Sequence, residues 1–326
     1  MKENDIRPSD LFQKYIDLGV EDIKQFFLNA LLKPINCPAC NKKGVFAFNK
    51  LGFYYEECSE CKTLYVSPRP EKKAFELYYS DSKSSQFWAN EFYKETEKER
   101  REQVWKPKAK LVLDVIKSLN DIQSVVDIGG GYGIFIEELK KLDNNLDLLV
   151  IEPSTQLANV CKAKELNVKC CFFEEVNTDE LPYAKTLYTS FELFEHLYDP
   201  KVFLEKLFSS MKSNDVFLFT TLNGMGVDIQ TLWEKSKSVS PPHHLNFFNP
   251  KSIEKLLVEV GFEVLEISTP GKLDIDIMNN NILDIKDRFW KNFLEQSSES
   301  EKANMQKFIS EHLLSSHMMI LCKKRG

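Results

Sequence analysis

The sequence predicts an α/β fold in which a mostly parallel sheet follows an N-terminal helical segment and a small cysteine-rich module. Three observations carry this prediction. From residue 124 onward, short apolar segments alternate with amphipathic ones, a pattern typical of strand–helix–strand crossovers and of a parallel sheet. A glycine-rich segment at residues 129–133 lies where the first of these strands meets its helix. Two CxxC pairs lie upstream of the sheet.

Composition and charge restrict the function. The chain has 326 residues, 43% of them hydrophobic, which is enough for one large domain with a smaller one appended. Its longest apolar runs are far shorter than the roughly 20 residues that cross a bilayer, and its first residues lack the apolar core of a signal peptide. We therefore expect a cytoplasmic protein without a transmembrane segment. The net charge of −6 argues against a nucleic-acid partner and favours a small or carrier-linked substrate.

The N-terminal segment predicts two short amphipathic helices. Ser9 is expected to cap the first helix and Gly19 to end it, and the second helix is expected to end before Pro34. We expect the apolar faces of these helices to pack against the rest of the protein; a substrate lid is the alternative.

The cysteine-rich module predicts a zinc ribbon. Its two CxxC pairs are Cys37 with Cys40 and Cys58 with Cys61, separated by two aromatic segments that a turn at residues 49–52 joins. Each pair brings two thiolates to one side of a tight turn, so together they complete a tetrahedral sulfur shell that suits zinc. With four protein ligands the zinc would be structural. A redox dithiol is the alternative, but it explains neither the second pair nor the hairpin.

The segment VVDIGGGYG joins the first strand of the sheet to its helix and has the pattern D-x-G-x-G-x-G, beginning at Asp127. Its central glycines are Gly129, Gly130 and Gly131. Because glycine has no Cβ, a ligand can approach the backbone closely here. Ile134 stands where a dinucleotide fingerprint needs Gly or Ala, which argues against a dehydrogenase. Glu152 ends the second strand, where a carboxylate can accept both hydroxyls of an adenosine ribose.

With this pattern the chain resembles the class I S-adenosylmethionine-dependent methyltransferases over residues 110–270. The resemblance implies a Rossmann-like sheet with an antiparallel last strand and S-adenosylmethionine as the cofactor. It also implies that Asp127 and the glycines hold the methionine part of the cofactor and that Glu152 holds the ribose. Glu174 or Glu175, after the third strand, would meet the adenine.

The segment FELFEHLYDP follows the fourth strand and resembles a family segment in which a leucine, an acid and a histidine precede DP. This resemblance places Glu192 at the cofactor and Glu195 among the catalytic candidates. His196 is expected to be structural, because it begins a helix after the strand. No chemistry is assigned to His312 or His317.

Residues 240–250, SPPHHLNFFNP, place His243 and His244 between two prolines and two phenylalanines. An enzyme that methylates a hydroxyl must remove a proton whose free pKa is far above neutrality. An imidazole with an unperturbed pKa of about 6.5 is largely neutral in the cytoplasm and can take that proton. The prolines restrict the loop and the phenylalanines can exclude water. Either histidine could instead cap the next helix or satisfy a buried carbonyl.

The ribbon, connector, sheet and histidine loop together resemble bacterial methyltransferases that act on sugars or polysaccharide precursors. Relatives that methylate carbon on nucleotide-linked keto-sugars carry a Tyr-His-Glu-His loop. Here His243 replaces the glutamate and a proline replaces the tyrosine, which favours oxygen as the acceptor. We therefore expect methyl transfer to a sugar hydroxyl of a nucleotide-linked or lipid-carried glycan precursor, with a loop histidine as general base.

Three alternatives remain at this point: carbon methylation of a keto-sugar, methylation of RNA, and a scaffold protein that binds the cofactor without turnover. The oligomeric state does not follow from the sequence. The expected division is N-terminal helices at 1–33, the ribbon at 34–70, a helical connector or lid at 71–118, and the methyltransferase domain at 119–326 with a helical insertion near 276–316.

Overall fold

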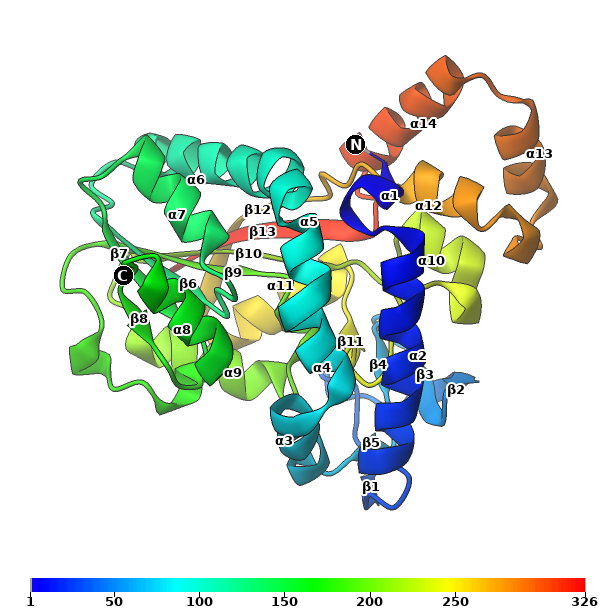
Figure 1. Ribbon diagram of the computed structural model, residues 1–326, viewed down its shortest axis with the longest axis horizontal. Coiled ribbons are helices and arrows are strands. Elements are labelled where there is room, and N and C mark those ends of the chain that lie inside the picture. The colour runs from blue at the N-terminus through cyan, green and yellow to red at the C-terminus, as the bar shows by residue number, and fades with distance from the viewer. Residues whose placement is uncertain (1, 326) are drawn as a thin grey trace.

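A seven-stranded sheet forms the centre of the computed structural model, which describes residues 2–325 (Figure 1). The strands are β6 (Ser124–Ile128), β7 (Asp147–Ile151), β8 (Val168–Lys169), β9 (Thr186–Phe191), β10 (Val216–Leu222), β12 (Phe262–Ser268) and β13 (His317–Lys324). Their order is β12-β13-β10-β9-β6-β7-β8. Only β13 runs antiparallel to the other strands of this sheet, so the predicted Rossmann-like fold class with an antiparallel last strand is confirmed.

Helices cover both faces of this sheet. They are α6 (Lys106–Leu119), α7 (Ile134–Leu142), α8 (Thr155–Ala163), α9 (Pro200–Ser210) and α11 (Pro250–Val260). Successive residues of a strand point to opposite faces, and the adjacent Val125 and Val126 are both fully buried. Val125 packs in one apolar cluster with α6 and α7, whereas Val126 packs in another with α9 and α11. A parallel sheet buried on both faces is the result.

The N-terminal segment differs from the prediction. It forms α1 (Glu3–Ile6) and one continuous helix, α2 (Ser9–Phe26), so Gly19 does not end a helix and Ser9 is its first residue and not its cap. Glycine costs only about 1 kcal/mol inside a helix. The packing of Phe12 and Tyr15 against the aromatic cluster of the connector outweighs that cost.

The ribbon contains β2 (Gly44–Lys50), β3 (Phe53–Cys58) and β4 (Leu64–Val66), with the short pair β1 (Leu32–Lys33) and β5 (Arg69–Pro70) beside it. The turn of its hairpin is Leu51 and Gly52, both with positive φ. A fourth strand, β11 (Asn246–Phe247), pairs with β4 and comes from the histidine loop, about 180 residues further along the chain. The ribbon therefore shares a sheet and an apolar core with the rest of the molecule.

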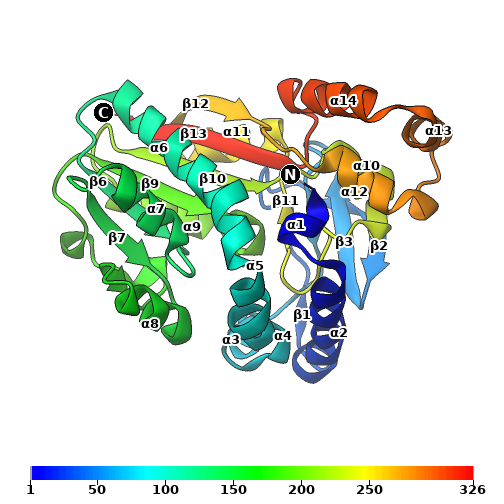
Figure 2. The same cartoon turned by 45° about the horizontal axis from the view of Figure 1, so that its top comes forward.

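The connector begins with α3 (Lys72–Asp81) and continues as one long helical segment: α4 (Lys83–Phe87), a π-helical turn η1 (Trp88–Phe92), α5 (Tyr93–Arg100), a second π turn η2 (Arg101–Trp105) and α6. In Figures 1 and 2 its first half runs beside α2. π turns are rare and are frequent at functional sites.

Three helices separate β12 from β13: α12 (Asp274–Asn280), α13 (Arg288–Gln296) and α14 (Glu299–Glu311), with the short η7 (Ile282–Asp284). They project beyond the sheet in Figures 1 and 2, and with α10 (Val227–Leu232) they form an apolar cluster of their own. The remaining short turns are η3 (Phe173–Glu175), η4 (Thr178–Glu180), η5 (Phe194–His196) and η6 (Trp233–Lys235).

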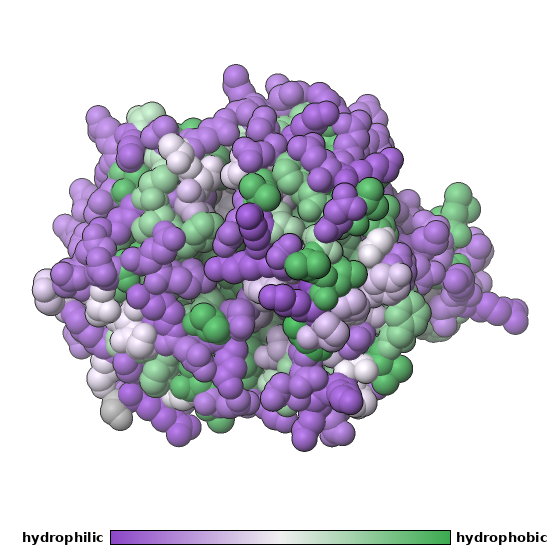
Figure 3. Space-filling view, turned by 90° about the horizontal axis from the view of Figure 1, so that it is seen from below, coloured by the Kyte–Doolittle hydropathy of each residue, from purple (hydrophilic) through white to green (hydrophobic). Residues whose placement is uncertain are grey.

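The helices of the described residues and one face of the surface can be compared with what a membrane requires. None of these helices combines the length and apolar character needed to span a bilayer. The face shown in Figure 3 is mainly hydrophilic, and its hydrophobic residues form small separate groups.

Candidate active site and cysteine cluster

The glycine loop lies at the carboxyl end of β6, where ligands bind in open parallel sheets. Gly129 and Gly131 have φ values of 74° and 54°, in the left-handed region that favours glycine. A Cβ at Gly130 would lie 2.6 Å from Val150 Cγ1 and 2.8 Å from Asp127 Oδ2. A Cβ at Gly131 would meet nothing within 4 Å. The loop therefore closes tightly on the sheet at Gly130 and is open at Gly131.

Asp127 lies in β6, and Glu152 directly follows the neighbouring strand β7. Thr189 Oγ1 donates a hydrogen bond of 2.7 Å to Asp127 Oδ1, and burial raises the pKa of Asp127 to about 7. The two carboxylate oxygens of Glu152 accept hydrogen bonds of 2.9 Å from the backbone N–H groups of Gly131 and Ser154. Burial also raises the pKa of Glu152. The structure thus brings Asp127, the glycines and Glu152 into one site.

Glu174 and Glu175 lie on η3. Both are exposed, and Glu175 Oε2 accepts a hydrogen bond of 3.2 Å from Phe172 N and so caps its own turn. Their contact with adenine stays a prediction.

Glu192 has a left-handed backbone with φ 54°, which costs roughly 1–3 kcal/mol for a residue other than glycine and is frequent at active sites. Its Oε1 accepts a hydrogen bond of 2.7 Å from Thr220 and lies 3.4 Å from His317 Nδ1 and 3.8 Å from Lys108 Nζ. Burial favours its neutral form, but the charges of His317, when it is protonated, and of Lys108, with the Thr220 hydrogen bond, outweigh burial and lower the pKa of Glu192 to about 2. Because burial lowers the pKa of His317 itself, Lys108 is the cation that acts on Glu192 at neutral pH. Glu192 is therefore an ionised carboxylate beside the glycine loop.

Glu195, His196 and His244 form a compact cluster in which ligand-capable atoms all lie within 4.8 Å of one another. The rings of His196 and His244 are 4.8 Å apart and nearly perpendicular. Burial, with the nearby charge of Glu192, raises the pKa of Glu195 to about 8, so this carboxyl is largely protonated at neutral pH. His196, expected to be structural, thus joins the candidate site.

His244 has its tautomer set by the backbone. Its Nδ1 lies 2.6 Å from the carbonyl oxygen of Ser238, and a carbonyl can only accept, so Nδ1 carries the proton. The lone pair is therefore on Nε2. Burial lowers the pKa of His244 to about 4, with the Arg7 charge acting in the same direction, so the ring is neutral at cellular pH.

His243 has different surroundings. Its Nε2 lies 2.5 Å from the hydroxyl of Tyr78, and its ring contacts those of Tyr15 and Tyr79, with centroids 5.5 and 6.2 Å away. Burial lowers the pKa of His243 to about 3. The two adjacent histidines therefore differ in which nitrogen is engaged: Nε2 in His243 and Nδ1 in His244.

The ribbon holds the histidine loop in place. Tyr55 of β3 donates a hydrogen bond of 2.9 Å to the carbonyl of His244, and the fully buried Arg69 donates one of 2.8 Å to Asn246 Oδ1. Asn249, at the end of the loop, donates 2.7 Å to the carbonyl of Cys61. The geometry of the loop therefore depends on the ribbon.

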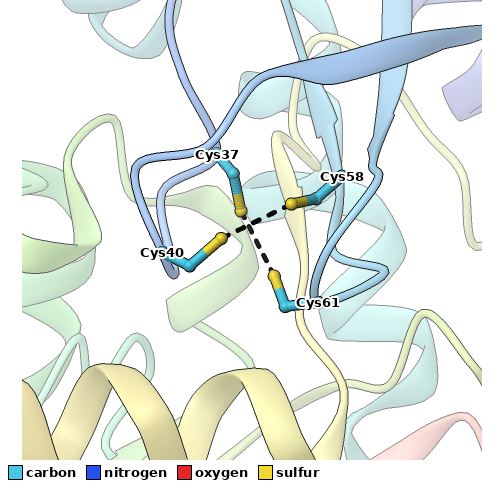
Figure 4. A group of neighbouring side chains, drawn as sticks. All are labelled: Cys37, Cys40, Cys58 and Cys61. Atoms are coloured by element: carbon cyan, nitrogen blue, oxygen red, sulfur yellow. Dashed lines mark hydrogen bonds between the residues drawn. The ribbon is translucent and has the colours of Figure 1, made fainter.

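The four cysteines of the ribbon point toward a common centre (Figure 4). The Sγ atoms of Cys37 and Cys61 are 3.5 Å apart, and those of Cys40 and Cys58 are 3.4 Å apart. The two pairs lie in equivalent turns, because the N–H of each first cysteine binds the carbonyl five residues later: Lys42 and Thr63, respectively. Four sulfurs about 2.3 Å from one zinc would be about 3.8 Å apart, so a small adjustment would fit the ion.

Comparison with known proteins defines the class. The model of the methyltransferase-domain family matches residues 97–267, over half of the chain, and the chain belongs to this family. The expected class of enzyme, an S-adenosylmethionine-dependent methyltransferase, is thereby confirmed at the level of the family.

Individual relatives are more distant. The chain is 27% identical over 152 residues to carboxy-S-adenosyl-L-methionine synthase of Nautilia profundicola, covering 42% of this chain and 64% of that protein. It therefore spans less than two thirds of that relative's length.

Solved structures of methyltransferases are similar to the chain at low sequence identity. The plantazolicin methyltransferase BpumL in complex with SAH has a TM-score of 0.50 and 13% identity, covering 77% of this chain and 93% of the other. A SAM-dependent methyltransferase from Archaeoglobus fulgidus has a TM-score of 0.47 and 19% identity, covering 71% of this chain and all of the other.

Several residues of the site were not among the sequence candidates. They are Arg7, Tyr15, Tyr78, Lys108, Ser238 and His317. No local pattern marks them, because each comes from an element far from the glycine loop or contributes a backbone atom. The one signal was the aromatic content of residues 71–118, a segment that the sequence predicts to be a helical connector or lid.

Proposed function

We propose that the chain transfers the methyl group of S-adenosylmethionine to a sugar hydroxyl of a nucleotide-linked or lipid-carried glycan precursor, with His244 as the general base. The observation that carries this proposal is the hydrogen bond from His244 Nδ1 to the Ser238 carbonyl. It leaves Nε2 as a neutral acceptor beside Glu195 and His196, at the carboxyl edge of the sheet.

The glycine loop and its acids fit the cofactor. The open backbone at Gly131 leaves room for the methionine part near Asp127, and Glu152 keeps further lone pairs for the ribose hydroxyls. Glu192, ionised at the same edge, suits the ammonium group of the cofactor. When bound, the sulfonium supplies an activated methyl group.

His244 would accept the acceptor's hydroxyl proton at Nε2 as the hydroxyl oxygen forms its bond to the methyl carbon and the carbon–sulfur bond breaks. Orientation contributes much of such an acceleration, and the general base typically adds a factor of about 10² to 10⁴. Glu195, protonated because burial raises its pKa to about 8, can donate a hydrogen bond within this cluster.

A sugar acceptor is supported by the surroundings of the histidine loop. Tyr15 and Tyr79, which are not fully buried, supply flat apolar surfaces with polar edges, which suit a ligand that is apolar on its faces and polar at its rim. The net charge of −6 disfavours the RNA alternative.

Zinc in the cysteine cluster is the second part of the proposal. Cys37, Cys40, Cys58 and Cys61 would supply all four ligands, which leaves no position for a catalytic water. Its role would be structural. It would fix the knuckle whose Cys61 carbonyl accepts a hydrogen bond from Asn249 of the histidine loop, and the end of β3, whose Tyr55 donates to the carbonyl of His244.

The test is mass spectrometry of products after purified protein and S-adenosylmethionine are incubated with a panel of nucleotide-linked sugars, with boiled protein as the control. We expect a mass gain of one methyl group on at least one sugar, located on oxygen by fragmentation. A methyl group on carbon would indicate the keto-sugar alternative. Cofactor binding without any methylated sugar would contradict the proposed acceptor, and methylated RNA in a parallel assay would replace it.

A further inference from the structure

Three cations near the candidate active site are held by aromatic rings. The guanidinium carbon of Arg7 is 5.7 Å from the ring centroid of Phe12. That of Arg100 is 5.8 Å from Trp88 and 5.2 Å from Tyr93. Lys108 Nζ is 4.3 Å from the Phe191 ring and 5.2 Å from Trp105. A ring attracts the charge without using the N–H groups, so the donors stay available.

Neither Arg7 nor Arg100 has an acidic partner within 4.0 Å among residues 2–325. Arg100 donates one hydrogen bond, of 3.4 Å, to the carbonyl of Ile6, and its buried Nε has no partner. Arg101, the next residue, pairs with Glu97, Glu137 and Glu138. Arg101 therefore has carboxylate partners for its charge. Arg100 has none among residues 2–325, so its charge is not balanced by the protein.

Burial and mutual repulsion make this arrangement costly. Burial lowers the pKa of Arg7, and the charge of Arg100 lowers it further. Burial likewise lowers the pKa of Lys108. Unpaired guanidinium groups in partly buried positions are costly unless an anion balances them, and their planar donors match the oxygens of a phosphate.

A row of aromatic rings connects this cationic group to the histidine loop. The ring of Tyr15 is 5.5 Å from that of His243 and 4.9 Å from that of Trp88, which in turn lies 5.8 Å from the guanidinium of Arg100. A sugar lying along these rings near His244 would have its phosphate beside Arg7 and Arg100.

We infer that Arg7 and Arg100 form a binding site for a phosphate group of the acceptor, adjacent to the sugar that is methylated. This inference rests on the proposed function and assigns the residues that would hold the phosphate or diphosphate through which such a sugar is linked to its nucleotide or lipid. The other source of an anion is the carboxylate of the cofactor, and the experiment separates the two.

The experiment is isothermal titration of the full chain with inorganic pyrophosphate at low ionic strength, with saturating S-adenosylhomocysteine, for wild type, Arg7→Gln, Arg100→Gln and Arg100→Lys. Lys94→Gln is the matched control, because Lys94 is exposed on the same helix and loses the same charge. We expect each glutamine variant to weaken pyrophosphate binding at least ~10-fold, with partial recovery in Arg100→Lys and less than a twofold change in the control.

The affinity for S-adenosylhomocysteine, titrated separately, should change less than about twofold in every variant. If it falls together with pyrophosphate binding, the arginines serve the cofactor carboxylate and the inference is wrong. It is also overturned if wild type does not bind pyrophosphate, or if the glutamine variants bind it as wild type does. Pyrophosphate binding needs no turnover. The titration can therefore be interpreted even if the proposed methyl transfer is not observed.

Discussion

At the scale of single residues, His243 and His244 differ in the atom that each leaves free. The Ser238 carbonyl engages Nδ1 of His244, whereas the Tyr78 hydroxyl engages Nε2 of His243. Only His244 combines an assigned tautomer with a position in the cluster of Glu195 and His196. We therefore assign proton transfer to His244 and a positioning role to His243.

Alanine substitutions test this assignment. His244→Ala should lower kcat at least ~100-fold, because it removes the base, while the affinity for S-adenosylhomocysteine stays within about twofold. His243→Ala should raise KM more than it lowers kcat, because it disturbs the rings beside the acceptor. Steady-state kinetics and titration of the cofactor product measure both effects. Full activity in both variants would show that the loop is structural.

The pH dependence of the reaction follows from the buried state of His244. A base works when neutral, so its activity is present above its pKa and lost as pH falls through it. Because burial lowers the pKa of His244 to about 4, we expect kcat/KM to persist to about pH 5 and to fall below that. A profile that already falls near pH 6.5, the usual histidine value, would mean that a solvated group limits the rate.

At the scale of elements, two buried aspartates, Asp228 of α10 and Asp274 of α12, lie near one another where these helices pack. Asp228 is fully buried and neither of its carboxyl oxygens has a partner among the described residues, while Asp274 accepts hydrogen bonds from Ser315 and Gln306. Burial, together with the charge of Asp274, raises the pKa of Asp228 to about 8. Asp228 is therefore neutral in the folded chain at neutral pH.

This raised pKa predicts a pH-dependent stability. A group whose folded pKa exceeds its unfolded value of about 4 stabilises at low pH, and that contribution is lost as pH rises toward 8. Between pH 6 and 8.5 wild type should lose about 2–3 kcal/mol of unfolding free energy relative to Asp228→Asn, measured by urea unfolding. The exposed Asp284→Asn serves as control and should follow wild type. If the unfolding free energy changes with pH equally in all three proteins, Asp228 is not a neutral carboxyl in the folded chain.

At the scale of the whole molecule, the ribbon and the sheet are joined through the histidine loop. The strand β11 completes the ribbon's sheet, and Phe247 and Phe248 of the same loop lie in the two apolar clusters that the ribbon shares with the catalytic core. A loosened ribbon would therefore disturb the histidines before it disturbed the glycine loop. The division of the chain into separate domains stays a prediction.

Metal removal tests this arrangement. Purified protein should contain one zinc per chain, and Cys58→Ser or a strong chelator should lower Tm, because the knuckles lose the ion that closes them. Binding of S-adenosylhomocysteine should survive at temperatures where methyl transfer is lost. Zinc analysis, thermal melting and titration provide these readouts. If the purified protein contains no metal and its Tm does not change when chelator is added, the proposal of a structural zinc is wrong.

Patterns that repeat over a few residues were enough to predict the architecture. The apolar alternation after residue 124 predicted the strands and the helices between them, because the periods of strand and helix are local properties. The same holds for Gly129, Glu152 and the two CxxC pairs, whose chemistry is tied to a turn or a strand end. The prediction for Gly19 was wrong because packing of α2 against the connector outweighs the low helix propensity of glycine.

The sequence by itself determined the class of fold, the glycine loop with its acids and the four cysteines, since all of these depend on neighbours along the chain. Only the tertiary structure decided which nitrogen of each histidine is free, which arginine stays unpaired and that the ribbon holds the histidine loop. Those features depend on contacts such as Tyr78 with His243, 165 residues apart, and Arg100 with Ile6, 94 apart. Folding creates such contacts by burying distant segments together, and no local period records them.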